Sequence, residues 1–331
     1  MTKTFRVKIA VPAWAKWIIS DFSDWDRNPQ EVTKLAPEGV WEVELPLEAY
    51  FEYAFMDEWG QVRADPENQE VAENPWTKEA RAIWGPEYRA SEASWGVEVG
   101  GRLERHRLPS IHLQQNRRLM TYTPLNHQTQ NLPLIILQDG VAYYRFAKIH
   151  LTLEKLLAEQ KIRPAHLLFL EPLDRSLEYP YFEPYQHFVV EEALPFIQDK
   201  LPLTGEKILM GASLGGLVSS LLLWHYPEHF HSLVSQSGAF LGSPQNKDYY
   251  RSQHSWFLER IRQEEKRDFR CYLEVGQFEW LHNINRDIYK TLQAKGYDCL
   301  YRERPAGHNW VNWRNGFAEA LSFALATESS Y

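Results

Sequence analysis

Long apolar runs, abundant cysteine and an excess of basic charge are all missing from this chain. No stretch approaches the roughly 20 apolar residues that span a bilayer, so we expect no membrane association. Lysine and arginine number 36 against 44 aspartate and glutamate, and this balance argues against a nucleic acid partner. Residues 1–12 carry scattered charges and no apolar core of a signal peptide. We therefore expect a cytoplasmic protein, or one trimmed of its signal.

The two cysteines, Cys271 and Cys299, are too few to build a disulfide framework in 331 residues. We expect both to be buried free thiols. Metal-binding patterns are also missing, since His229 and His231 flank Phe230 without a carboxylate or cysteine at ligand spacing, and no H-E-x-x-H occurs. We therefore expect no metal and no other cofactor.

The most informative segment is Gly211-Ala-Ser-Leu-Gly-Gly216. A short apolar run before it, residues 208–210, is typical of a buried strand, and a helical apolar run follows it. Such a G-x-S-x-G pattern can arise by chance, but a strand before it and a helix after it favour a nucleophilic serine on a tight turn. We predict Ser213 as the nucleophile. The amide of Leu214, which opens the helix, is a predicted oxyanion donor.

A serine nucleophile needs a base and an acid later in the chain. His308 lies in Pro305-Ala-Gly-His-Asn-Trp310, directly after the last predicted strand, and is the predicted base. Glu279 follows the preceding predicted strand and is the predicted acid. His282 is the alternative base or a substrate contact. The second oxyanion donor should follow an earlier strand, where the amides of Gly140 and Val141 are the candidates.

The spacing of apolar runs and turn residues divides the chain into two parts. Residues 1–88 contain short alternating and aromatic runs separated by turn residues, which predict a small β-sandwich. Residues 89–103 have the composition of a linker. Residues 104–331 alternate strands with helices, which predicts a mainly parallel sheet covered on both faces. The predicted fold class is α/β with a preceding β-sandwich.

Tryptophan is concentrated in the first part, with eight of the 13 before residue 96. Trp25, Trp59 and Trp76 stand beside turn residues, so they are candidates for stacking on a sugar or another flat ligand. Packing at the rim of the sandwich is the alternative.

The first part resembles the immunoglobulin-like early-set domains that precede glycogen-branching and isoamylase-type enzymes, and a similar module precedes the hydrolase in enterochelin esterases. The resemblance is carried by residues 21–25, 39–41, 53–55, 57–59 and 63–68. It implies an immunoglobulin-like fold and suggests a glycan-binding module.

The second part resembles the esterase D and enterochelin-esterase-like branch of the α/β-hydrolases. The matching stretches are residues 137–140, 174–179, 190–195, 211–216, 275–279, 307–310 and 313–314. The resemblance implies serine ester hydrolysis by Ser213, His308 and Glu279, and it suggests that Arg175 lines the substrate pocket.

The substrate class is left open by the residues around the predicted site. Ferric siderophores are anionic, whereas the cationic candidates are few: Arg175, Arg314 and His282. Trp280 and Trp310 could line a cleft for an aromatic acyl group. Trp313 is expected to pack under the following helix.

The predicted function is a serine carboxylic ester hydrolase of the enterochelin-esterase type acting on a small-molecule ester. A feruloyl or acetyl esterase on sugar esters and an acyltransferase are the alternatives on the same residues. A carbohydrate-binding protein with a vestigial hydrolase domain is a further one. A homodimer is compatible with the sequence.

Overall fold

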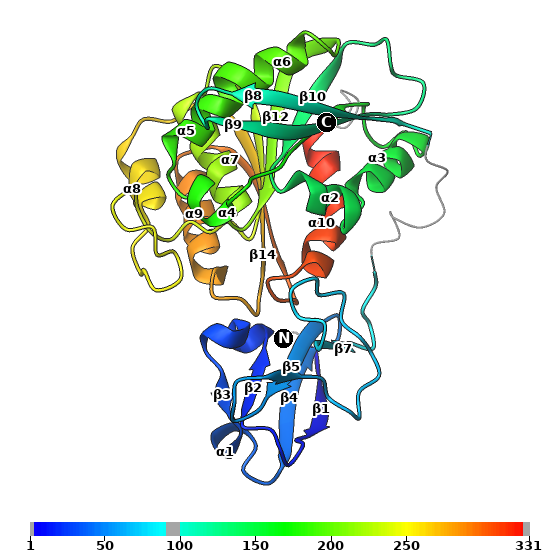
Figure 1. Cartoon of the computed structure of the whole chain (residues 1–331), viewed down its shortest axis with the longest axis vertical. Helices are drawn as coiled ribbons and strands as arrows, with labels where there is room; N and C mark the ends of the chain where they lie inside the picture. Colours follow the sequence, from blue (N-terminus) through cyan, green and yellow to red (C-terminus); the bar gives the residue numbers. More distant parts are fainter. Residues whose placement is uncertain (1–2, 91–99, 327–331) are drawn as a thin grey trace. The chain divides into compact units, whose positions relative to one another are not determined.

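The computed structural model describes residues 3–90 and 100–326 and divides into two compact units (Figure 1). The first unit comprises Met1–Ala90, Val275–His282 and Glu303–Asn315, and the second comprises Ser91–Glu274, Asn283–Arg302 and Gly316–Tyr331. Most of the predicted linker, residues 91–99, lies outside the described residues.

The first unit is built on two antiparallel sheets. Strand β1 (Thr4–Ala10) pairs with β4 (Val40–Pro46) in a two-stranded sheet. The second sheet has the order β3-β2-β5-β6, with β7 also paired to β5. Its strands are β2 (Trp17–Ser20), β3 (Gln30–Glu31), β5 (Tyr50–Met56), β6 (Val62–Arg63) and β7 (Arg81–Trp84). Between β2 and β4 come the short helices η1 (Asp21–Ser23), η2 (Trp25–Arg27) and α1 (Val32–Leu35).

The core of the first unit lies between its two sheets. Strand β4 alternates exposed and buried residues, as expected of a strand with one face in a core, and its Trp41 packs against Phe51 and Tyr53 of β5. The sheet-rich first part predicted from the alternating pattern is therefore confirmed.

Two C-terminal segments belong to this first unit, whereas the sequence analysis placed them with residues 104–331. Phe278 packs on Phe22 and Phe51, with ring centroids 5.0 and 6.1 Å away. The amide of Tyr50 also donates to the Pro305 carbonyl oxygen at 3.1 Å. These contacts join segments more than 200 residues apart, which no local pattern can indicate.

The second unit is built on one eight-stranded sheet in the order β15-β14-β13-β12-β10-β11-β9-β8. Strands β11, β10, β12, β13 and β14 run parallel, and the β8–β9 hairpin pairs antiparallel with β11. The strands are β8 (Arg102–Ser110), β9 (Gln115–Thr123), β10 (Leu132–Leu137), β11 (His166–Leu170), β12 (Leu203–Ala212), β13 (Ser232–Gln236), β14 (Arg270–Gly276) and β15 (Asp298–Arg304). The mainly parallel sheet is as predicted.

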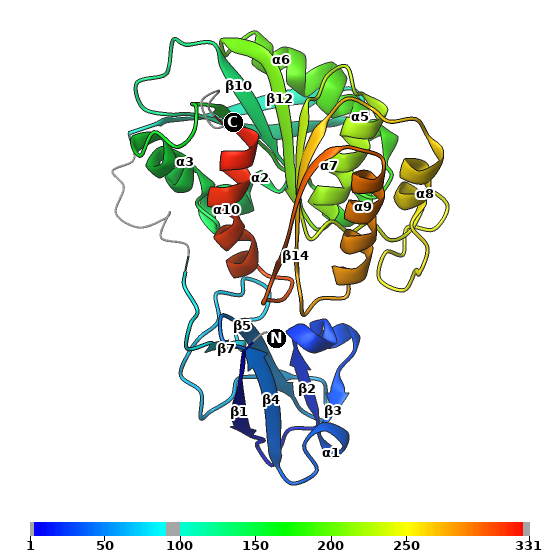
Figure 2. The same cartoon turned by 180° about the vertical axis from the view of Figure 1, so that it is seen from behind.

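Helices cover both faces of this sheet. In both views α2, α3 and α10 lie on one side of β12 and β14, and α7, α8 and α9 lie on the other (Figures 1 and 2). The helices are α2 (Gly140–Arg145), α3 (Ile149–Ala158), α4 (Arg175–Glu178), α5 (Glu183–His187), the π-helix η4 (Phe188–Ala193), α6 (Leu194–Gln198), α7 (Leu214–His225), α8 (Trp256–Gln263), α9 (His282–Ala294) and α10 (Trp310–Ala324).

Two expectations about this unit need correction. The helix expected over residues 141–160 is broken before α3, where Lys148 has a left-handed backbone with φ 54°. The expectation of free thiols was wrong, because Cys271 on β14 and Cys299 on β15 form a disulfide. The two strands are neighbours in the sheet, which brings the Cα atoms of the cysteines to 4.8 Å.

None of the helices in the described ranges, 3–90 and 100–326, combines the length and the apolar character required to cross a membrane.

Candidate active site

Ser213 stands in the second unit at a sharp turn between β12 and α7. Its backbone has φ 57° and ψ -121°, a conformation that costs free energy for a residue with a Cβ atom. The turn is held by its backbone hydrogen bonds, since the Ser213 amide donates to Gln236 O at 2.8 Å and Ala239 N donates to Ser213 O at 3.0 Å. A serine in this geometry at the end of a central parallel strand has the form of a nucleophile elbow.

The glycines around Ser213 allow the strand and the helix to approach closely. A Cβ atom on Gly211 would lie 2.3 Å from the backbone of Gly215, and one on Gly216 would lie 2.6 Å from Ser235 Oγ. Both distances are far below van der Waals contact. Glycine is therefore required at both positions for β12 and α7 to approach each other this closely.

The predicted oxyanion turn lies between β10 and α2. Asp139 has φ 57°, and a Cβ atom on Gly140 would lie 2.5 Å from Phe169 Cβ, so only glycine fits there. The amide of Val141, one of the two predicted donors, instead donates to Glu171 Oε2 at 2.9 Å. The amide of Gly140 is consequently the better candidate for the second oxyanion donor.

Arg175 links this turn to the serine elbow. Its Nε donates to Asp139 Oδ1 at 2.9 Å, and its Nη2 donates to Ala212 O at 3.0 Å. Asp139 directly precedes Gly140, and Ala212 directly precedes Ser213. The guanidinium that was expected to line the substrate pocket thus bonds the side chain of Asp139 at the turn and the backbone of Ala212 at the elbow.

His308 and Glu279 form a hydrogen-bonded pair in the first unit. His308 Nδ1 lies 2.5 Å from Glu279 Oε2, and the other carboxylate oxygen accepts from Gly276 N at 2.6 Å. The Glu279 side chain is fully buried, whereas that of His308 is 16% exposed. A carboxylate bound to Nδ1 leaves Nε2 as the nitrogen that can accept a proton, which is the arrangement required of a catalytic base.

Aromatic rings surround His308. The Trp280 ring lies 4.6 Å from it and the Trp313 ring 5.0 Å. Trp310 and Trp76 pack against Trp313 at 4.8 and 6.4 Å. Trp313 is buried as expected, while Trp76 is 63% exposed. Of the two rings predicted to line an acyl cleft, Trp280 therefore lies beside the candidate base and Trp310 packs on Trp313.

The carboxylates of Asp21 and Asp24 lie close to this pair, and the sequence analysis missed both. Asp24 Oδ1 accepts from Trp280 N at 3.3 Å, and a Cβ atom on Gly307 would lie 2.1 Å from Asp21. Burial raises the pKa of Asp24 to about 6, against the lowering effect of His308, and burial with the nearby Glu52 charge raises the pKa of Asp21 well above its usual range. Both aspartates belong to the 21–25 stretch that carried the resemblance.

The remaining predicted cations are paired with carboxylates. His282 Nε2 lies 3.0 Å from Glu303 Oε2, so a carboxylate stands beside the alternative base. Arg314 Nη1 and Nη2 bond to the two oxygens of Glu73 at 2.6 and 2.9 Å. The charge of Arg314 is therefore neutralised by a protein carboxylate.

The chain is similar in sequence to a family of known esterases. Residues 110–324 match the family model Esterase, described as "Putative esterase". The chain is 25% identical over 245 residues to the iron(III) enterobactin esterase of Escherichia coli (strain K12), an alignment that covers 71% of this chain and 57% of that protein. The chain thus spans just over half the length of this relative. It is also 26% identical over 248 residues to the uncharacterized protein YjcH of Bacillus subtilis (strain 168), covering 68% of this chain and 98% of that one.

The enterochelin esterase of Shigella flexneri is a structural neighbour. Its crystal structure superposes with a TM-score of 0.75 at 20% sequence identity, covering 98% of this chain and 93% of that chain. At this level of identity the similarity shows a shared fold.

Proposed function

Because this chain belongs to the Esterase family and has the predicted α/β-hydrolase fold with a sheet-rich first unit, we propose that it hydrolyses carboxylic esters through an acyl-enzyme on Ser213. The observation that carries the proposal is the strained serine elbow, together with a histidine whose Nδ1 is bound by a buried glutamate. The chain order Ser213, Glu279, His308 is that of α/β-hydrolases.

In the proposed reaction the Ser213 hydroxyl attacks the ester carbonyl carbon, and its proton passes to His308 Nε2. Glu279 holds the imidazole with Nδ1–H toward itself and stabilises the imidazolium that forms. The amides of Leu214 and Gly140 donate to the developing oxyanion. The intermediate then expels the alcohol, which takes the proton from Nε2. Water hydrolyses the acyl-enzyme by the same route, releasing the acid and restoring Ser213.

The proposed role of Arg175 is to position the elbow and the oxyanion turn, which differs from the substrate contact expected from the sequence. Replacing it by lysine keeps the charge but leaves one donor group where two acceptors are bonded. We expect Arg175→Lys to lower kcat about 10- to 100-fold, with little change in KM, because misplacing catalytic groups by about 1 Å has effects of this size.

Arg163→Lys is the matched control, since Arg163 makes a bidentate pair with Glu206 at 2.6 and 2.7 Å elsewhere in the same unit. It should leave both constants unchanged. A large rise in KM with kcat intact for Arg175→Lys would instead return Arg175 to the substrate pocket.

We propose an enterochelin-type substrate, an ester whose acyl part carries an aromatic group, as the leading substrate class. The ring of Trp280, 4.6 Å from the ring of His308, supports an aromatic acyl group. The pairing of Arg175 and Arg314 with carboxylates favours the alternative of a feruloyl or acetyl ester of a sugar, because paired guanidinium groups are less available to an anionic iron complex.

The test is a comparison of kcat/KM for iron-free enterobactin, its ferric complex, a feruloyl arabinose ester, an acetylated sugar and p-nitrophenyl butyrate. We expect both forms of enterobactin to be hydrolysed with the highest kcat/KM. A preference for the feruloyl or acetyl ester would establish the alternative substrate class. Formation of a new ester with an added sugar, in place of free acid, would identify an acyltransferase. No turnover of any ester would overturn the proposal.

Several finer expectations stay predictions: an immunoglobulin-like first domain over 1–88, a hydrolase domain over 104–331, glycan binding and a homodimer. The exposure of Trp59 (74%) and Trp76 (63%) supports a stacking surface.

A cytoplasmic location is expected from the sequence, whereas a disulfide is more typical of oxidising compartments. Fractionation of cells that produce the protein would decide between these locations.

A further inference from the structure

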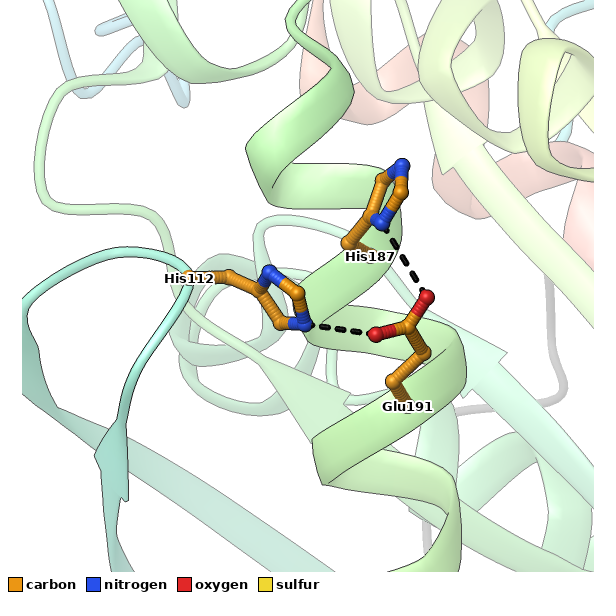
Figure 3. A group of neighbouring side chains, drawn as sticks. All are labelled: His112, His187 and Glu191. Atoms are coloured by element: carbon orange, nitrogen blue, oxygen red, sulfur yellow. Dashed lines mark hydrogen bonds and ion pairs between the residues drawn. The ribbon is translucent and has the colours of Figure 1, made fainter.

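Two histidines and a glutamate converge on the surface of the second unit (Figure 3). His112 Nε2 lies 2.7 Å from Glu191 Oε2, and His187 Nδ1 lies 3.1 Å from Glu191 Oε1. The candidate ligand atoms of the three residues all lie within 4.8 Å of one another. Several kinds of zinc site use this ligand set, which consists of two imidazole nitrogens and a carboxylate oxygen close together.

The helical part of this cluster is preorganised by its backbone. His187 is the last residue of α5, and Glu191 lies four residues later in the π-helix η4, so both side chains point from one side of the same continuous helical segment (Figure 3). π-helical turns are rare in proteins and are frequent at functional sites. The spacing here therefore places two ligands together without any contribution from His112.

The third ligand is held in place through its backbone. His112 lies at the tip of the β8–β9 hairpin, where Glu192 Oε1 accepts from Ile111 N at 2.7 Å and from His112 N at 3.2 Å. The turn itself is tied by Leu113 N donating to Ser110 Oγ at 3.0 Å. Glu192 thus docks the hairpin on the π-helix independently of the His112 ring.

The cluster is open to water and lies among negative charges. The side chains of His112, His187 and Glu191 are 30%, 39% and 51% exposed. Water can therefore reach a bound ion and complete its coordination. Glu192 directly follows Glu191 in η4, so two carboxylates stand at the site, and a dication would be favoured beside them.

We propose that His112, His187 and Glu191 bind one Zn²⁺ ion, with water in the fourth position. Imidazole ligands favour Zn²⁺ over Mg²⁺ and Ca²⁺, which prefer oxygen ligands. The ion would cross-link the tip of the β8–β9 hairpin to the α5–η4 helical segment. None of the three residues is assigned a part in ester hydrolysis, so the site is independent of the proposed function.

The first test is zinc binding by the full-length protein after removal of metals and of any affinity tag. Competition with a chromophoric chelator should show one equivalent of Zn²⁺ bound per chain, and Zn²⁺ should raise the midpoint of thermal unfolding. Replacement by Co²⁺ should give visible absorption bands of a four-coordinate site. Glu192→Gln changes the residue that docks the hairpin and leaves the three proposed ligands in place. We expect it to weaken Zn²⁺ binding less than the loss of a ligand does.

His187→Ala and Glu191→Gln should each weaken zinc binding by about tenfold or more and abolish the thermal shift, because each removes one of three protein ligands. These side chains are part-exposed, so the variants are expected to fold, and circular dichroism checks this. His254→Ala is the matched control, since His254 and Glu259 form an exposed pair at 3.3 Å without a second histidine. The proposal would be overturned if the wild-type protein bound Zn²⁺ no more tightly than His187→Ala does. It would also be overturned if His254→Ala weakened Zn²⁺ binding as much as His187→Ala does.

Discussion

Replacing Ser213 by alanine is expected to lower kcat for ester hydrolysis about 10⁴- to 10⁶-fold, with little change in stability. The size follows from removal of the nucleophile, after which only the oxyanion donors and substrate binding accelerate the reaction. Steady-state hydrolysis of p-nitrophenyl butyrate by the purified variant measures it. Ser220→Ala is the control on the helix that follows Ser213, because Ser220 Oγ donates to Gly216 O at 2.8 Å and has no proposed role.

The same assay tests whether Ser213 and His308 act as one unit. His308→Ala should reduce kcat about as far as Ser213→Ala, and the double variant should be no slower than either single variant. Losses that multiply in the double variant would mean that the two residues act separately. An active Ser213→Ala variant would contradict the acyl-enzyme mechanism directly.

Glu279→Gln is expected to lower kcat about 10⁴-fold while leaving KM nearly unchanged. Gly276 N donates to Glu279 Oε1, so the carbonyl oxygen of a glutamine should take that position and its amide NH₂ should face His308. The NH₂ group is a donor, so it would require Nδ1 to be unprotonated and Nε2 to carry the proton. In that tautomer His308 cannot accept the Ser213 proton. The full pH profile of kcat should be measured, since a mere shift of the optimum would contradict this explanation.

Glu303→Gln provides the matched control for this variant. Glu303 pairs with His282 in the same unit, at 3.0 Å. We expect its activity to stay within a few-fold of the wild type. If Glu303→Gln were inactive and Glu279→Gln active, His282 would be the base, as in the alternative that the sequence analysis kept open, and Glu303 would be its acid.

The sequence by itself determined the strand, turn and helix around Ser213. The reason is local: a buried strand, glycines at 211 and 215 and a following apolar helix specify one short piece of chain, whose close packing admits no Cβ atom at Gly211. The positions of Glu279 and His308 after successive strands were also readable, because strand ends in an α/β chain follow from its alternating pattern. Their hydrogen bond is consistent with that order.

Only the tertiary structure decided the features that depend on contacts between distant segments. Cys271 and Cys299 are bonded because β14 and β15 are neighbours, a pairing that the cysteine count could not indicate. Arg175 was expected to line the substrate pocket, which stays a prediction; its two bonds to Asp139 and Ala212 arise because α4 meets the end of β12 and the turn after β10.

The positions of Asp21 and Asp24 near His308 also depend on contacts between distant segments of the chain. Asp21 and Asp24 lie some 280 residues before the base, and they approach it only because the segments that carry Glu279 and His308 pack on the first unit. The proposed zinc ligands are likewise separated, His112 from Glu191 by 79 residues. Local patterns report on residues that are near in sequence, whereas charge pairing, disulfides and ligand sets are decided by which elements the folded chain brings side by side.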